Sequence, residues 1–213
     1  QALAPYYNDD TVYTYTNEIS NKKVSKTVRQ CVDEALERLG SMQNANGGFS
    51  SWNTDNVESI SQVVVALCSL GINPTSDSRF ISTEGKSLLD GMLRFKLTDG
   101  GFCHVLGGGW NSMATDQATY ALVSYWRLEN GMRALYDMRG ERSAADTAAI
   151  AAAQAAIAAA SDPSAANYKA QLKTALAAFR AVSKAERRYV DNYSLLAAGL
   201  DLVGSEESLD NDA

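Results

Sequence analysis

One pattern occurs twice in this chain, first as SMQNANGGFSSWNTDNVESISQVVVALCSLG (residues 41–71) and then as RFKLTDGGFCHVLGGGWNSMATDQATYALVSYW (residues 94–126). In both copies a Gly-Gly-Phe element is followed by a polar loop and then by a long stretch that is poor in charge. Gly47 and Gly100 lie 53 residues apart, and Gln62 and Gln117 lie 55 residues apart. Self-similarity at such a period predicts stacked or circularly arranged supersecondary units.

Each copy predicts a helical hairpin with one solvent-facing helix and one enclosed helix. In the first helix, predicted over residues 25–42, apolar side chains recur at steps of three and four, which is typical of an amphipathic helix; they are Val24, Val28, Cys31, Ala35, Leu39 and Met42. Residues 58–70 are apolar nearly all round, so we expect that helix to be buried, with Gly71 as its C-terminal stop. Residues 85–95 and 113–126 repeat the contrast. An outer layer of helices around an inner layer is therefore predicted.

The Gly-Gly-Phe elements are predicted to be structural turns. A glycine after a helix can adopt the left-handed conformation that ends the helix in a tight turn. We expect the phenylalanine that follows to pack back between helices. The predicted turn residues are Gly47, Gly48, Phe49, Gly100, Gly101 and Phe102.

These motifs, in this order, resemble the prenyltransferase and squalene-cyclase-like α/α-toroid superfamily, in the version found in large surface proteins of Gram-positive bacteria. The resemblance rests on MQNANGGFSSW, ESISQVVVALCSLGINP, GKSLLDGMLRF, DGGFCHV and MATDQATYALVSYWRLENG. It implies an all-α fold of outer and inner helices and an extracellular, cell-surface location. Residues 1–139 would be the C-terminal part of such a toroid, with QALAPYY as the end of an inner helix and the upstream half outside this sequence.

One stretch departs from that family. NDDTVYTYTNEISNKK (residues 8–23) is longer than the corresponding loop, and Val12, Tyr13 and Tyr15 predict a short extended segment there.

Residues 140–204 differ in composition and predict a small three- or four-helix bundle. SAADTAAIAAAQAAIAAA has high helix propensity, with Ser143 as N-cap and Asp146 at the third helical position. SDPSAANY breaks that helix. The next helix carries an apolar stripe at Leu172, Leu176, Phe179 and Val182, and residues 183–186 predict a capping box that opens a third short helix. This part resembles helical spacer modules of Gram-positive surface proteins. Residues 205–213 predict an acidic linker.

Composition and motif content argue against several functions. A net charge of −6 argues against nucleic acid or an anionic membrane as partner. No apolar run approaches the roughly 20 residues that a membrane span needs. Cys103 and His104 lack further zinc ligands, and neither the DxDD motif of terpene cyclases nor a Cys-Gly-Glu-Gln thioester motif occurs. No catalytic residue, metal site or cofactor is therefore predicted.

The loops after the two Gly-Gly-Phe elements and the starts of the enclosed helices should open at one mouth of the ring. Aromatic, amide and carboxylate side chains gather there and suit a carbohydrate, peptide or small-molecule ligand. The predicted ligand-binding residues are Trp52, Asn53, Asp55, Glu58, Trp110, Asn111, Thr115 and Asp116. The favoured function is therefore a non-catalytic ligand-recognition or adhesion module of a large secreted or surface protein.

Three alternatives remain open. Trp52 and Trp110 could simply cover helix ends, and Asp116 could complement the helix dipole in the first turn of its helix. The chain could belong to an isoprenoid-type enzyme whose catalytic residues lie upstream. It could also be a purely structural spacer without a pocket.

Overall fold

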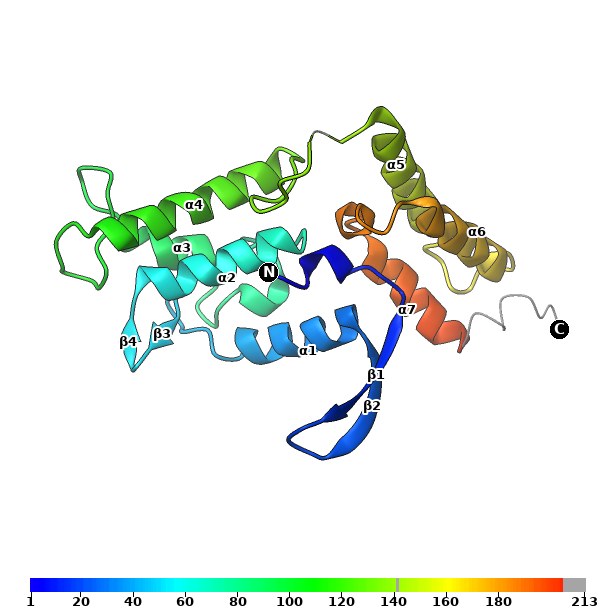
Figure 1. Cartoon of the computed structure of the whole chain (residues 1–213), viewed down its shortest axis with the longest axis horizontal. Helices are drawn as coiled ribbons and strands as arrows, with labels where there is room; N and C mark the ends of the chain where they lie inside the picture. Colours follow the sequence, from blue (N-terminus) through cyan, green and yellow to red (C-terminus); the bar gives the residue numbers. More distant parts are fainter. Residues whose placement is uncertain (141, 205–213) are drawn as a thin grey trace. The chain divides into compact units, whose positions relative to one another are not determined.

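The computed structural model describes residues 1–140 and 142–204, which are mostly helical (Figure 1). These residues form seven α-helices and two small two-stranded antiparallel sheets, so the all-α prediction is right for the helices and misses the two hairpins. The predicted acidic linker 205–213 lies outside the described residues. The chain packs as two compact units. The first unit is Gln30–Gly140, and the second joins Ala2–Arg29 to the chain after residue 141.

The helices of the first unit are α1 (Val28–Gly40), α2 (Val57–Ser69), α3 (Leu88–Leu93) and α4 (Ser112–Glu129). Helix α2 is enclosed as predicted, because ten of its thirteen residues are buried. Helices α2 and α4 lie side by side (Figure 1).

The predicted apolar stripe of the first helix is wrong in part. Leu36, which the stripe omitted, is the buried residue of α1, whereas Ala35 and Met42 are exposed. The stripe was counted from Val24, which lies in strand β2 (Lys22–Thr27) before the helix begins. Within α1, Val28, Cys31 and Leu39 of the predicted stripe are half-buried, so the stripe fails at Ala35 and omits Leu36.

The first Gly-Gly-Phe element closes a tight turn, as predicted; we call residues 44–49 corner one. Asn44 N donates to Gly48 O at 2.9 Å, and Gly47 N donates back to Asn44 O at 2.9 Å. Gly48 N is held by the Asn46 Oδ1 at 2.8 Å. Gly47 has a φ of 85°, which a side chain would strain, and Phe49 is buried.

The second element, residues 97–102 or corner two, repeats this turn bond for bond. Leu97 N donates to Gly101 O at 2.8 Å, and Gly100 N donates to Leu97 O at 3.1 Å. Asp99 Oδ1 accepts from Gly101 N at 2.9 Å, as Asn46 does in corner one. Gly100 has a φ of 92°, and Phe102 is buried. The sequence repeat is therefore a repeat of backbone structure.

The helices after the two corners also begin and end alike. Asn56 caps α2 by accepting from Ser59 N, and Asn111 caps α4 by accepting from Ala114 N. Both helices end in a Schellman motif, with Gly71 or Gly131 in the left-handed conformation. The bonds run from Gly71 N to Cys68 O and Ile72 N to Leu67 O, and from Gly131 N to Leu128 O and Met132 N to Arg127 O.

Helix α4 is enclosed on one side only, which differs from the prediction for the second copy. Its buried residues are small and form one stripe: Ala114, Ala118, Ala121 and Ser124. Because α2 is the helix against which α4 packs, this stripe faces α2. Val123 and Trp126, elsewhere on α4, are exposed.

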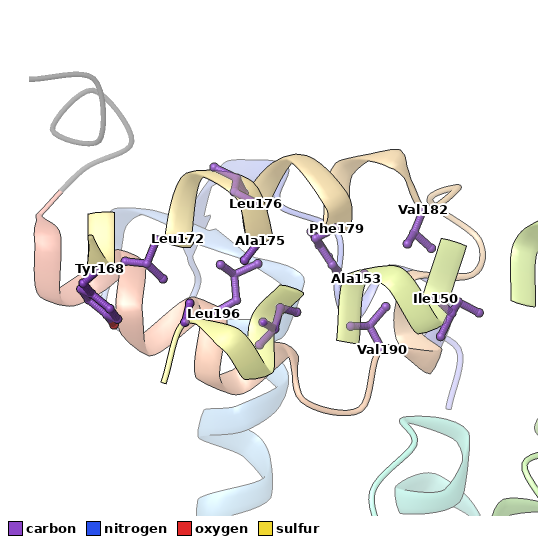
Figure 2. Packing of buried hydrophobic residues seen from close by; sticks show 12 residues of the cluster. Ile150, Ala153, Tyr168, Leu172, Ala175, Leu176, Phe179, Val182, Val190 and Leu196 are labelled. Atoms are coloured by element: carbon purple, nitrogen blue, oxygen red, sulfur yellow. The ribbon is translucent and has the colours of Figure 1, made fainter. Parts of the chain in front are cut away.

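The second unit contains three α-helices, in agreement with the predicted bundle: α5 (Ala144–Ala159), α6 (Tyr168–Ala181) and α7 (Tyr193–Val203). Figure 2 shows its core, where Ile150 and Ala153 of α5 face the side chains of α6. Alanine lets α5 approach α6 closely, and the predicted α6 stripe is buried. Ser143 caps α5 as predicted, with its Oγ accepting from Asp146 N at 3.0 Å.

Two local predictions for the second unit need correction. Instead of a helix opened by a capping box, residues 183–186 lead into a 3-10 turn, Arg187–Tyr189, and the Glu186 carboxylate accepts from Arg142 Nε at 3.1 Å. Instead of an α-helix end, QALAPYY forms a 3-10 turn, Ala4–Tyr6. The extended segment is confirmed as strand β1 (Val12–Asn17), which pairs with β2. Residues 2–29 thus pack with the bundle.

Candidate functional site

Trp52 stands at the tip of a short hairpin that follows corner one. Strands β3 (Ser50–Ser51) and β4 (Thr54–Asp55) pair, and the turn between them consists of Trp52 and Asn53. Both turn residues have positive φ, 51° and 60°, as a type I′ turn requires. Positive φ is uncommon for a bulky residue, and the Trp52 side chain is 98% exposed. Trp52 therefore covers no helix end, which contradicts that alternative for this residue.

Asp55, a predicted ligand-binding residue, holds corner one together. Its carboxylate accepts from Asn44 Nδ2 at 2.7 Å, Asn46 Nδ2 at 2.9 Å and Ser50 Oγ at 2.5 Å. Burial acts to raise the pKa of Asp55, but the hydrogen bonds from Ser50 and Asn46 and the nearby charge of Arg94 outweigh it and lower the pKa. Because the oxygens already have these partners, Asp55 positions the Trp52 hairpin.

Glu58 and His104 form a pair at the start of α2. The Glu58 side chain is 12% exposed, and both of its oxygens lie within hydrogen-bond distance of His104 Nδ1, at 2.8 and 2.9 Å. The imidazole is half exposed, and with Nδ1 engaged, Nε2 is the ring nitrogen left for a ligand. The His104 backbone oxygen also accepts from Val57 N at 3.4 Å. The loop after corner two therefore lies against the helix that follows corner one.

Sequence reasoning considered His104 only as a zinc ligand and did not include it in the binding set. The sequence signal that could have placed His104 in the binding set is its position in the repeat. His104 comes two residues after Phe102, and its counterpart in the first copy is Ser51, which comes two residues after Phe49 and next to Trp52. Its neighbour Cys103 is buried, with Sγ 3.4 Å from Phe95 O. Within residues 1–140 and 142–204, no three His, Cys, Asp or Glu side chains gather closely enough to hold a metal ion.

Trp110 partly covers corner two. A Cβ added to Gly101 would lie 2.3 Å from Trp110 Cδ1, so the indole packs on that glycine, yet 60% of the residue is exposed. Trp110 therefore covers a glycine of corner two, whereas the alternative placed it over a helix end. Asn111 caps α4, and Thr115 Oγ1 accepts from Phe102 N at 2.9 Å, so both of these residues secure corner two.

Asp116 does not lie in the first turn of its helix. Helix α4 begins at Ser112, and no acidic residue occurs in its first turn, so the proposed role in complementing the helix dipole is wrong. Asp116 is exposed.

The structure thus brings part of the predicted set together at one end of the helix pair, which we call the corner end (residues 50–58 and 103–113). Trp52, Asn53 and Trp110 present exposed surface there, beside the Glu58–His104 pair. Leu106 and Met113 add exposed apolar surface. Asp55, Asn111 and Thr115 support the loops from within.

Comparison of the chain with protein-family models, with curated proteins and with solved structures finds no match in any of the three. Among the described helices, none is both long and apolar enough to cross a bilayer.

Proposed function

We propose that this chain is a non-catalytic recognition module and that Trp52 is its principal ligand contact. The supporting observation is a fully exposed indole on a hairpin whose conformation is fixed by a type I′ turn and by the hydrogen bonds of Asp55. A fixed hairpin backbone loses little further backbone entropy on binding, and tryptophan dominates binding energy at many interfaces.

A carbohydrate is the ligand class that this surface fits best. The flat indole of Trp52 offers an apolar face on which a sugar ring can stack, because sugar rings carry C–H groups on one side and hydroxyls at the edge. Asn53 offers an amide at the same tip, and His104 Nε2 offers a further hydrogen-bonding group at the corner end. Peptide and small-molecule ligands are the other outcomes of the test below.

The finer fold proposal is that the two hairpins belong to an α/α toroid of the terpenoid cyclase-like type, carried by a secreted bacterial surface protein. One observation in its support is that Gln62 Nε2 of α2 donates to Oε1 of Gln117, its counterpart in α4, at 3.1 Å. Another is that α4 packs on α2 through one stripe and leaves other surface exposed. Head-to-tail stacking of equivalent units generates rings when the rotation closes.

The test is a glycan array probed with the whole chain, with Trp52→Ala as variant and Trp126→Ala as matched control. Trp126 is 55% exposed on α4, outside the corner end, so its loss removes a similar aromatic surface elsewhere. We expect Trp52→Ala to weaken glycan binding by about 30-fold or more, as for a tryptophan hot spot, and Trp126→Ala to leave it unchanged.

Equal binding by wild type and Trp52→Ala would refute the site. Binding of no glycan by the wild-type chain would refute the ligand class, and the same variants would then be used against peptide and metabolite libraries. Failure of those as well would favour the structural spacer.

A further inference from the structure

Residues 7–10, Tyr-Asn-Asp-Asp, are held by the helical bundle of the second unit; we call this contact the clasp. At its centre lies Asn8, which is 3% exposed. Its Nδ2 donates to Arg187 O at 2.7 Å and to Val190 O at 3.3 Å, in and just after the 3-10 turn before α7. A buried amide that makes these bonds fixes the register of the segment on the bundle.

Ion pairs flank that amide. Asp10 contacts Arg187 Nη1 at 3.2 Å and Arg180 Nε at 3.2 Å, and Asp9 contacts Lys184 Nζ at 3.4 Å. The Arg187 and Asp10 side chains are 8% and 31% exposed, so salt screens their pair less than it screens a surface pair, whereas Lys184, the partner of Asp9, is 66% exposed. An acidic segment thus meets a basic stretch of the bundle.

A stack of rings and guanidinium groups lies behind the ion pairs. The Arg29 guanidinium is 4.4 Å from the ring centre of Tyr7 and 5.0 Å from that of Tyr193. The Tyr193 ring in turn lies 4.5 Å from the Phe179 ring. The Arg187 guanidinium lies 5.0 Å from the ring centre of Phe179. Of these contacts, the one between Arg29 and Tyr193 joins residues 2–29 to the bundle.

The clasp joins parts of the chain that are far apart in sequence. The residues it pairs are separated by 170 to 182 positions, and the whole first unit, Gln30–Gly140, lies between them in sequence. The first unit is therefore an insertion in the second. Tension applied to the chain on either side of the clasp meets the clasp before it can reach residues 30–140.

We propose that the clasp is a mechanical shunt. A pull between residue 2 and residue 204 passes from residues 7–10 directly into the end of α6 and the 3-10 turn that precedes α7, and residues 30–140 carry no load until the clasp opens. A protein that recognises a ligand through residues 30–140 would then keep its binding surface folded under tension. The shunt itself is independent of the ligand proposed above.

Force spectroscopy on the whole chain, held by peptide tags at its two ends, tests this proposal. Unfolding of residues 30–140 should appear as its own late step of about 390 Å, at about 3.5 Å per residue, less the folded separation of its ends. Asp10→Lys places a cation against Arg180 and Arg187 and should lower the force of the first event. Glu18→Lys makes the same charge change at an exposed position of residues 2–29, outside the clasp, and should leave the force of the first event unchanged.

A second variant separates the shunt from general stability. Ile60→Val trims a fully buried side chain of the first unit. It should lower the force of the late step and leave the force of the first event unchanged, both in the wild-type background and together with Asp10→Lys. Should Asp10→Lys fail to fold by far-UV circular dichroism, Asp9→Asn takes its place.

Three results would overturn the shunt: a first event that is already the long step of residues 30–140, a lower first-event force in Ile60→Val alone, or equal first-event forces in the clasp variant and Glu18→Lys.

Discussion

For the substitution Gly91→Ala, helix propensity predicts a gain in the stability of the first unit, whereas packing predicts a loss. Gly91 lies inside α3, where alanine is favoured over glycine by about 1 kcal/mol. A Cβ at this position, however, would lie 2.5 Å from both the carbonyl carbon and the oxygen of Gly47 and 2.8 Å from Gly48 N. Ordinary contacts of a Cβ are about 3.4 Å or longer.

The clash is with backbone atoms of corner one, which cannot rotate away as a side chain can. Overpacking a dense interior costs about 1–3 kcal/mol, and a backbone clash belongs in the upper part of that range. After subtracting the gain in propensity, we expect Gly91→Ala to lower the free energy of unfolding of the first unit by about 1–2 kcal/mol. For a unit of this size, that lowers Tm by at least about 4 °C.

Urea unfolding followed by tryptophan fluorescence measures this change in the first unit alone, because Trp52, Trp110 and Trp126 all lie in Gln30–Gly140. Gly109→Ala is the matched control, since a Cβ there meets nothing within 4 Å and its φ is not positive. We expect the control to stay within about 1 kcal/mol of wild type. A Gly91→Ala protein as stable as wild type, or more stable, would show that the close approach of α3 to corner one is not what the structure indicates.

Three further measurements test other parts of the structure. Asp55→Asn should destabilise the first unit by about 1–3 kcal/mol in urea unfolding, because the donors around it lose a charged acceptor. Asp116→Asn, at an exposed position, should shift the urea midpoint little, and equal effects of the two variants would contradict the structural role of Asp55. Burial acts to raise the pKa of Asp9, but its hydrogen bonds from Thr11 and Lys184 lower the pKa below the ordinary value. The stabilising contribution of Asp9 is therefore complete above about pH 4 and is lost as the pH falls through the lowered pKa. Asp9→Asn should flatten the pH dependence of thermal unfolding below about pH 4, and an unchanged slope would argue against this role. Burial raises the pKa of the Cys68 thiol to about 12. Near pH 8, iodoacetamide should therefore leave Cys68 unmodified in the native chain while half-buried Cys31 reacts, as measured by mass spectrometry. Rapid labelling of native Cys68 would contradict its burial.

Local sequence signals predicted the repeat because each of its features depends on a few neighbouring residues. The left-handed glycines of the corners and the apolar run of α2 are encoded within a few positions of where they act. The same holds for Ser143, whose side chain caps the helix that it opens.

The strands could be predicted only in part. Val12, Tyr13 and Tyr15 indicated β1, but β2 is rich in lysine and Val24 is its one apolar residue, so it lacks the apolar alternation that identifies a strand. The β3–β4 hairpin is shorter still, and its Trp-Asn turn lacks the glycine that usually marks a type I′ turn.

The clasp and the roles of the polar site residues could not be predicted from sequence. Asn8 finds its acceptors at Arg187 and Val190, 179 and 182 positions away, and no local pattern encodes such a pair. Asp55 was assigned to a ligand because carboxylates often bind ligands, whereas in the fold the amides of corner one already occupy it.

The two corners share the same main-chain hydrogen-bond pattern but differ in the loops that follow them. After Phe49 the chain makes a two-residue turn between short strands, and after Phe102 it makes a longer excursion before returning at Trp110. The turn therefore tolerates inserts of unequal length and composition without a change in its own bonding. A library randomised at positions 51–54 and 105–109 should retain the scaffold, so the same framework could be adapted to new targets by changing its loops alone.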